Sequence, residues 1–536
     1  MNPIRLLPAF LSVGSWTMLS RVLGLVRDVL MAAILGTGPV AQAFLIAFTL
    51  PNMCRRFFGE GAFNLAFVPM FAKRVQTGED PRGFAEDAFS GLGSVLIAFS
   101  ILGHLVMPWL VYAMASGFAG DERFDLAVIY GRIAFPYILF ISLTALLSGV
   151  LNSLGRFAVA AAAPVLMNLI MIAFLIIGAR GNLDVGLWQS WSVPIAGIAQ
   201  LWLCWWACDR AGMRIRPRLP RLTPELRRLA VVATPAVLAG GVVQINLLVG
   251  RQVGSFFDGA VAWLSYADRL YQLPLGVVGA AISVVLLPDL SRRLHAGDTQ
   301  GGQDALNRGA EFTLALTLPA AVALVTIPGP LVSVLFERGA FGPADTAATA
   351  VAVAIYGAGL PAFVMQKVLS PLYYAREDTR SPFRFAVHAM IVNVVVALGL
   401  APVLGFEAAA LGTTVAGWTM FWQLWRGTRK MDGSARADAR LRRSAPRIIV
   451  ASLVMGAVLV VVAHLTRDWL ATDLVRYPAL ALLVAVGMVT YALGILATGA
   501  MSLSDLRGAM RRGGAKPATP ASGSPEPPAG PDGGAG

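Results

Sequence analysis

Charged residues are scarce in this chain of 536 residues, of which only 14% are Asp, Glu, Lys or Arg. A typical soluble domain carries about 25%. Hydrophobic residues make up 57% of the sequence, and the mean hydropathy is +0.68. Long apolar runs recur along nearly the whole length, which excludes an outer-membrane barrel because barrel strands alternate with a period of two. The composition therefore predicts an all-α polytopic membrane protein.

Cysteine, histidine and catalytic motifs are also scarce. Three cysteines, Cys54, Cys204 and Cys208, cannot build a disulfide framework. The four-residue spacing of the last two has no His or carboxylate beside it to complete a metal site. No P-loop and no HExxH motif occurs. We therefore expect no metal, no cofactor and no catalytic residue, and the four histidines are expected to be structural or interfacial: His104, His295, His388 and His464.

Apolar segments of the roughly 20 residues needed to cross a bilayer recur along the chain. The first, "MNPIRLLPAFLSVGSWTML", has no small-residue cleavage site and is predicted to be a transmembrane helix rather than a signal peptide. Fourteen spans are predicted, near residues 8–35, 41–70, 88–115, 127–151, 158–179, 185–208, 229–256, 261–289, 309–335, 346–374, 384–404, 407–426, 446–466 and 476–499.

The connections between these spans alternate in charge. Those on one side are rich in Arg and Lys, as in 209–228 and 427–445, whereas those on the other are short and acidic or mixed, as in "GDERFD" at 120–125. By the positive-inside rule, this pattern places both termini in the cytoplasm. It also explains the net charge of +13 without any nucleic-acid partner.

The two halves of the chain resemble each other at their openings. Arg27 and Arg251 are followed, 24 and 23 residues later, by a Leu-Pro pair, and then by "VPMFAKR" and "LPDLSRR". Repeats of this kind are common in transporters, where the substrate binds between the halves. The predicted organisation is an N-lobe at 1–208, a basic linker at 209–228, a C-lobe at 229–426, a second basic linker at 427–445, spans 13 and 14 at 446–500, and a disordered Pro/Gly/Ala-rich tail at 501–536.

Ionisable residues lie inside several predicted spans. A charge at the bilayer centre costs about 2.5–3.5 kcal/mol, so such residues normally face a protein interior or a watery cavity. We predict that they share one aqueous cavity. They are Arg21, Arg27 and Asp28 in span 1, Arg55, Arg56 and Glu60 in span 2, Arg251 in span 7, Asp268 and Arg269 in span 8, and Lys367 in span 10.

Helical spacing suggests how some of these groups pair. Arg21 and Asp28 are seven residues apart and share a helix face with Gly24, whereas Arg27 points elsewhere. The alternatives are that Arg56 and Arg251 snorkel or form structural ion pairs, that Lys367 is structural, and that the acidic groups sense protons rather than pair with arginine. A net cationic cavity favours an anionic ligand, and arginine forks fit phosphate oxygens.

Several segments carry a family resemblance. "SRVLGLVRD" with "QAFLIAFTLPNMCRRFFGEGAFNLAFVPMF", "SYADRLYQLPLGVVGAAISVVLLPDLS" and "KVLSPLYYAREDTRSP" resemble the MurJ/MviN lipid II flippases of the multidrug/oligosaccharidyl-lipid/polysaccharide exporter superfamily, over roughly residues 5–500. The resemblance implies fourteen helices in two six-helix lobes plus two C-terminal helices that offer a groove to a lipid tail. It also implies transport of undecaprenyl-pyrophosphate-linked glycopeptide across the bacterial inner membrane by alternating access.

The resemblance also assigns residue roles. The essential cavity arginines of the family correspond to Arg21, Arg27, Arg55 and Arg269, and its acidic partners to Asp28 and Glu60. Arg251 has a basic counterpart in only some members. Gln42 stands where relatives often have an acidic residue, and Gln272 stands where some have glutamate, which puts an acidic gate or a proton-coupling role at those positions in doubt.

The predicted function is therefore a lipid II flippase rather than an enzyme, with lipid II, membrane lipids and cell-wall synthesis proteins as partners. The arginines, with Arg251 and Lys367, are expected to bind the pyrophosphate, and Asp28, Glu60 and Asp268 to be their charge partners. The alternatives are a flippase for another polyprenyl-linked glycan, a drug or cation exporter, and a non-transporting cell-wall scaffold. A cation exporter should have an acidic cavity, which counts against it.

Overall fold

The computed structural model describes residues 6–55, 62–221, 223–231, 248–281, 290, 292–293, 297–429, 431 and 437–500. Within these ranges it describes all side chains except those of residues 6–12, 54–55, 62–65, 277–281 and 299. The predicted tail at 501–536, most of span 7 and the end of span 8 lie outside the described residues.

Every regular element in the described ranges is a helix. The helices of the N-terminal group are α1 (Leu6–Leu35), α2 (Pro39–Arg55), α3 (Ala62–Thr77), α4 (Pro81–Leu105), α5 (Met107–Met114), the short 3₁₀ helix η2 (Ser116–Phe118), α6 (Glu122–Ala134), α7 (Tyr137–Ser153), α8 (Phe157–Arg180) and α9 (Val185–Arg210). Those of the C-terminal group are α11 (Ala260–Ala281), α13 (Thr299–Thr326), α14 (Pro328–Phe336), α15 (Pro343–Tyr374), α16 (Arg380–Leu404) and α17 (Glu407–Thr428). The last helices are α18 (Ala439–Leu465), α19 (Arg467–Ala471) and α20 (Arg476–Thr498).

Local sequence signals account for many helix boundaries. Aspartate side chains cap the first turns of α4, α6, α9, α13 and α18, where each carboxylate accepts a hydrogen bond from a backbone N–H. Pro328 starts α14 directly after α13, because proline cannot continue the preceding hydrogen-bond ladder. Gly499 ends α20 in the left-handed conformation that glycine adopts at no steric cost.

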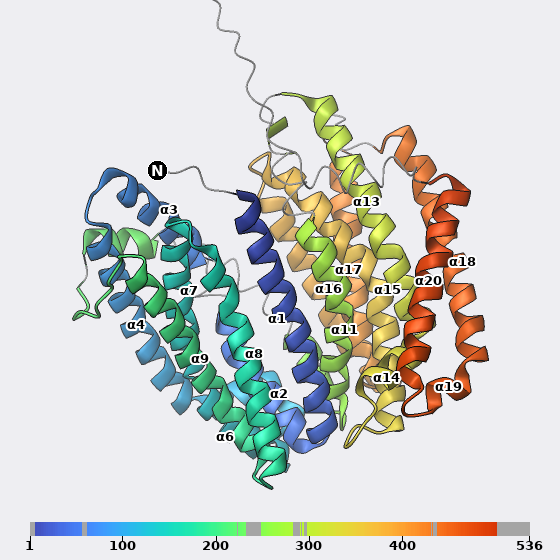
Figure 1. Ribbon diagram of the computed structural model, residues 1–536, viewed down its shortest axis with the longest axis horizontal. Helices are drawn as coiled ribbons and strands as arrows, with labels where there is room; N and C mark the ends of the chain where they lie inside the picture. The colour runs from blue at the N-terminus through green and yellow to red at the C-terminus, as the bar shows by residue number, and fades with distance from the viewer. Residues whose placement is uncertain are drawn as a thin grey trace, which may run out of the picture. The chain divides into compact units, whose positions relative to one another are not determined.

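The helices pack in three sets. In the N-terminal group, α8 packs on α1 and α9, α7 packs on α9, and α2 packs on α6. In the C-terminal group, α15 packs on α11, α13 and α17, and α16 packs on α17. Helices α18 and α20 pair with each other, and α18 lies along α13 (Figure 1). The two groups touch each other through α1 and α2 on one side and α11 and α14 on the other.

Eight helical segments are long and apolar enough to cross a membrane within the described ranges. They are Pro81–Leu105, Glu122–Ser153, Phe157–Arg180, Gln300–Thr326, Pro343–Tyr374, Arg380–Leu404, Ala439–Leu465 and Arg476–Thr498. The protein is thus an all-helical polytopic membrane protein. The predicted spans at 8–35, 41–70, 185–208, 229–256, 261–289 and 407–426 are not among these eight, so the total of fourteen stays a prediction.

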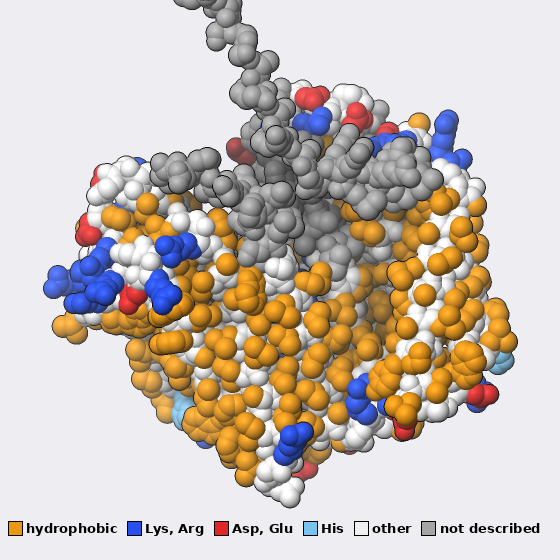
Figure 2. All heavy atoms as spheres, in the orientation of Figure 1, with side chains coloured by type: hydrophobic (Ala, Val, Ile, Leu, Met, Phe, Trp, Pro, Cys, Tyr) orange, Lys and Arg blue, Asp and Glu red, His pale blue; other side chains and the backbone are white. Residues whose placement is uncertain are grey.

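The outer surface fits this environment. Large apolar side chains are exposed along α18 and α20, among them Leu453, Val461, Met488 and Leu493. Figure 2 shows apolar side chains covering the middle of the visible face, with Lys and Arg gathered toward its margins. Exposing an apolar surface of this extent to water would be unfavourable, and such a surface is typical of a protein that faces lipid tails.

Candidate functional site

A cavity of about 560 Å³ lies where the two helix groups meet. Residues of α1, α2 and α8 line it from the N-terminal group, and residues of α11, α15 and α17 line it from the C-terminal group, together with the helical segment at 248–254. The charged lining residues are Arg21, Arg27, Arg251, Asp268 and Arg269. Four arginines and one carboxylate make the wall predominantly cationic.

Asp28 joins two of these arginines. Its Oδ1 lies 2.7 Å from Nη2 of Arg27, and its Oδ2 lies 2.6 Å from Nε of Arg269. The Arg269 Nε–H does not point at the carboxylate as a hydrogen bond requires, so this second contact is an ion pair without hydrogen-bond geometry. Asp28 is only 8% exposed. One buried carboxylate therefore holds guanidinium groups from both helix groups at the cavity wall.

This arrangement differs from the predicted pairing of Arg21 with Asp28. The structure shows no ion pair between those two residues, although both are described, and the neighbouring Arg27 takes the carboxylate instead. The physical reason is the length of the arginine side chain: a long side chain at the adjacent position reaches the carboxylate, so a shared helix face does not decide which arginine pairs with it. Arg21 extends instead toward α11, where it lies against Gly276.

Asn168 of α8 also holds Arg27, although it was not among the predicted site residues. Its Oδ1 accepts a hydrogen bond from Nη1 of Arg27 at 3.1 Å, and its Nδ2 donates to the backbone oxygens of Ser20 and Pro164 at 3.1 Å. Arg27 also lies over the ring of Phe48 on α2, 5.6 Å from its centroid. The available signal was a lone amide in the apolar run of 157–179.

Asp268 and Gln272 form a second polar pair on α11. The amide of Gln272 donates a hydrogen bond to Oδ2 of Asp268, and both side chains line the cavity beside Arg251. Gln272 therefore supplies a neutral donor to the neighbouring carboxylate.

The remaining predicted site residues are not among the described residues that line the cavity. Lys367 on α15 is exposed and is not among the lining residues, but it lies within electrostatic range of Arg21. Its assignment to the cavity stays a prediction. The side chain of Arg55 lies outside the described residues, as do Arg56 and Glu60, so the contribution of span 2 to the charge cluster also stays a prediction.

A second polar network joins the two helix groups around Arg123, at the start of α6. Its guanidinium pairs with Asp121 at 2.5 Å and with Asp258 at 3.0 Å, and it donates to Oε1 of Gln42 at 3.4 Å. These residues line a cavity of about 510 Å³ that is separate in its lining from the arginine cavity. Gln42 thus acts as a hydrogen-bond acceptor in this network.

Further contacts close the same end of the molecule. The N–H of Ala340 donates to the oxygen of Ala33 at 2.8 Å, and the hydroxyl of Tyr266 donates to the oxygen of Gly36 at 3.0 Å. Asp345 at the start of α15 accepts from the Thr37 hydroxyl at 2.6 Å and from the Trp263 indole at 2.9 Å. Nothing in the spacing of these residues along the sequence shows that the segments meet.

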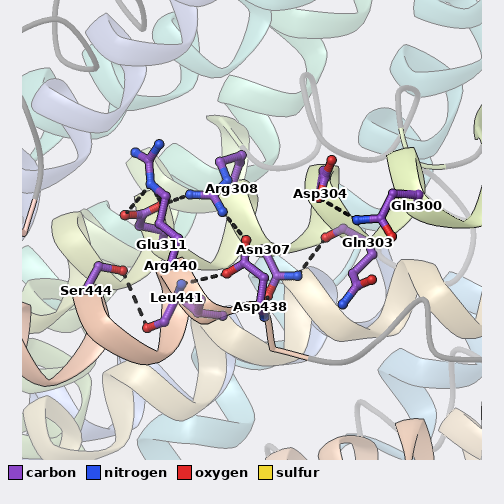
Figure 3. Close-up of polar contacts among 10 residues, drawn as sticks. All are labelled: Gln300, Gln303, Asp304, Asn307, Arg308, Glu311, Asp438, Arg440, Leu441 and Ser444. Atoms are coloured by element: carbon purple, nitrogen blue, oxygen red, sulfur yellow. Dashed lines mark hydrogen bonds and ion pairs between the residues drawn. The ribbon is translucent and has the colours of Figure 1, made fainter.

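A third network lies outside the cavities, where α13 meets the start of α18 (Figure 3). Glu311, whose side chain is 2% exposed, lies 2.5 Å from Nη1 of Arg308 and 3.2 Å from Nε of Arg440. Asp438 pairs with the same Arg308 and caps α18 by accepting from the N–H of Leu441 at 2.6 Å. These ion pairs attach the C-terminal helices to the C-terminal group.

The described part of the chain contains no cluster of side chains that could bind a metal ion. No group of three or more His, Cys, Asp or Glu side chains is arranged to hold an ion among those residues. Cys204 and Cys208 are both buried thiols that lie against α7, with Sγ of Cys204 3.7 Å from the Ser148 hydroxyl and Sγ of Cys208 3.8 Å from the Leu147 oxygen.

Comparison with solved structures places this fold. The protein described as "Lipid II flippase MurJ, inward closed conformation" superposes with a TM-score of 0.75 at 25% identity, covering 90% of this chain and 97% of that one. An inward-facing multidrug resistance MATE transporter of the MOP superfamily matches with a TM-score of 0.65 at 15% identity, covering 78% and 97%. The second match shows a shared fold alone.

Sequence comparison is more specific. The family model described as lipid II flippase MurJ matches residues 31–480. The probable lipid II flippase MurJ of Rhizobium tropici is 43% identical over 96% of this chain and 98% of its own length, and that of Rhizobium meliloti is 45% identical over 95% and 97%. The lipid II flippase MurJ of Burkholderia cenocepacia is 35% identical over 80% and 84%. The chain combines a helical membrane fold and an arginine-lined cavity between two helix groups with relatives that match over nearly its full length. It belongs to the MurJ family of lipid II flippases, which are transporters and not enzymes.

Proposed function

We propose that this chain moves lipid II, an undecaprenyl-pyrophosphate-linked glycopeptide, from the cytoplasmic to the periplasmic leaflet of a bacterial inner membrane by alternating access. Membership of the MurJ family supports the substrate. The alternation of basic and acidic connections supports fourteen spans with both termini in the cytoplasm. The two halves around the cavity, 1–208 and 229–426, serve as the moving lobes.

One observation carries the role of the cavity: Arg27 and Arg269, from different helix groups, converge on the buried Asp28 in its wall. Arginine presents paired N–H donors that match phosphate oxygens, and it stays charged when water is removed. Arg21 and Arg251 add positive charge to the same wall. A pyrophosphate has enough oxygens to contact several guanidinium groups at once, while the lipid tail stays in the membrane.

The contacts around Arg123 and Asp345 support a direction of opening. They join the two helix groups at the end that carries the short acidic connections, which the charge pattern assigns to the periplasm. In this state the cavity is therefore closed toward the periplasm, and lipid II enters from the cytoplasmic side. Transport then requires the Arg123–Asp258 pair to separate.

The experiment introduces Arg27→Ala or Arg269→Ala into the chromosomal gene, so that the variant gene is the only copy in the cell. It then measures the amount of lipid II that remains on the cytoplasmic face of the membrane. We expect both variants to reach the membrane but to accumulate lipid II there, because each removes a pyrophosphate donor. Arg180→Ala, at the exposed end of α8, is the matched control and should behave as the wild type.

Normal peptidoglycan synthesis with either cavity variant would overturn the cationic-cavity mechanism. Accumulation of a different polyprenyl-linked glycan, with lipid II unaffected, would instead identify another substrate of the same class. Loss of cell-wall synthesis with normal flipping would identify a scaffold role.

A further inference from the structure

Two cavity arginines cross from one helix group to a glycine of the other. A Cβ placed on Gly24 of α1 would overlap Nη2 of Arg269 and lie 3.2 Å from its Cζ. A Cβ placed on Gly276 of α11 would overlap Nη1 of Arg21. The exchange is reciprocal: α1 supplies Arg21 and receives Arg269, while α11 supplies Arg269 and receives Arg21. Each guanidinium occupies space that any residue other than glycine would fill.

These two glycines differ from glycines that let helices or loops pack closely. A Cβ on Gly117, for example, would lie 2.6 Å from the backbone nitrogen of Phe256, so a substitution there would push two segments of backbone apart. At Gly24 and Gly276 the obstructing atoms are the ends of long, flexible side chains. A methyl group there displaces an arginine rather than a helix.

The position of Gly24 also explains the Asp28 ion pair. Gly24 precedes Asp28 by one helical turn, so both lie on the same face of α1. With its terminal nitrogen against Gly24, Arg269 brings its Nε within 2.6 Å of Oδ2 of Asp28. The Nδ2 of Asn168, which positions Arg27, lies 3.7 Å from the same Cβ position. The space beside Gly24 thus adjoins Arg269 itself and the amide that orients Arg27.

We propose that Gly24 and Gly276 are positioning residues for lipid II transport, which seat Arg269 and Arg21 where both face the pyrophosphate. The inference rests on the proposed binding of pyrophosphate by the cavity and adds the surfaces against which its arginines are held. Neither glycine touches the substrate itself. Each acts through the arginine of the other helix group.

The test measures the dissociation constant of the purified full-length protein for undecaprenyl pyrophosphate in detergent micelles. Gly24→Ala and Gly276→Ala should each weaken binding roughly tenfold or more, because a charge-assisted hydrogen bond to the ligand is lost or misdirected. Gly14→Ala in α1 and Gly399→Ala in α16 are matched controls, since neither residue lines the cavity and a Cβ at either position meets nothing within 4 Å. Both controls should bind as the wild type does.

A double variant separates positioning from a general effect on the fold. If Gly24 acts through Arg269, Gly24→Ala/Arg269→Ala should bind no more weakly than Arg269→Ala alone. Additive losses, or a Gly24→Ala variant that binds like the wild type while Arg269→Ala does not, would overturn the positioning role and leave the cavity proposal standing. Wild-type binding by Arg269→Ala would overturn the cavity proposal itself.

The double variant also keeps the inference testable if Gly24→Ala does not fold. The added methyl then has no guanidinium to displace, so the double variant should be recovered folded. A double variant that still fails to fold would show that the methyl group clashes elsewhere, and the positioning role would be wrong.

Discussion

Replacing Asp28 by asparagine should release the two arginines that it holds. The change keeps the shape of the side chain but removes the charge between Arg27, at 2.7 Å, and Arg269, at 2.6 Å. Removing one partner of a buried ion pair costs about 3–5 kcal/mol. The side chains of Arg27 and Arg269 are 13% and 27% exposed, so water screens part of this cost. We therefore expect the free energy of unfolding to fall by about 2 kcal/mol.

Added pyrophosphate should restore much of that stability, because it supplies the missing negative charge between the same guanidinium groups. The assay is thermal unfolding of Asp28→Asn in detergent with and without inorganic pyrophosphate, with sodium sulfate at equal ionic strength as the salt control. A ligand at 100 times its dissociation constant stabilises a protein by about 2.7 kcal/mol. The midpoint of the variant should therefore rise by a few degrees with pyrophosphate, and by more than that of the wild type.

Two further variants decide whether the effect belongs to this site. Asp28→Asn/Arg269→Gln should lose the extra stabilisation, because one of the two receiving guanidinium groups is gone. Asp209→Asn, which changes an exposed carboxylate at the end of α9, should respond as the wild type does. Equal midpoint shifts in the wild type and in Asp28→Asn would refute the view that Asp28 occupies an anion position between the arginines.

Two other predictions concern networks outside the cavity. Asp121 is partly buried, which alone would raise its pKa, but hydrogen bonds from Arg123 and the positive charge of Arg123 hold the pKa below its ordinary value. A carboxylate whose pKa is lower in the folded state stabilises the protein at pH values above its unfolded pKa, which is near 4. This stabilisation should be lost as the pH falls through the lower, folded-state pKa. Arg123→Gln should flatten this part of the stability–pH curve. Glu311→Gln should lower the unfolding free energy by about 2 kcal/mol and increase proteolysis before α18, because two half-exposed arginines lose a buried partner. The control is Asp304→Asn, which changes an exposed residue on the same helix. Equal proteolysis of the two variants would contradict the anchoring role.

Much of the site could be predicted from single residues. An arginine inside an apolar run must find water or an anion, so Arg21, Arg27, Arg251 and Arg269 were identifiable without any structure. The pairing could not be predicted, because long side chains choose between neighbours at similar cost. Asn168 was missed since a lone amide in an apolar helix is usually satisfied by its own backbone, and its contact with Arg27 depends on α8 lying along α1.

Arg123 shows the same limit at the other end of the molecule. In the sequence "GDERFD" it belongs to a short charged connection, where exposed arginines are common. Its ion pair with residue 258, more than a hundred positions later, forms because the two segments lie beside each other in the folded chain. No local pattern records a contact of that kind.

The sequence by itself determined the membrane environment and the helical secondary structure, because apolar runs of this length require both. It also predicted an anionic ligand from the arginines within those runs. Only the tertiary structure decided which groups meet. It paired Asp28 with Arg27 and Arg269 rather than Arg21, and it laid Arg269 on Gly24 and Arg21 on Gly276. Periodicity specifies the face of a helix, but the neighbour of that face depends on how helices far apart in the chain pack together.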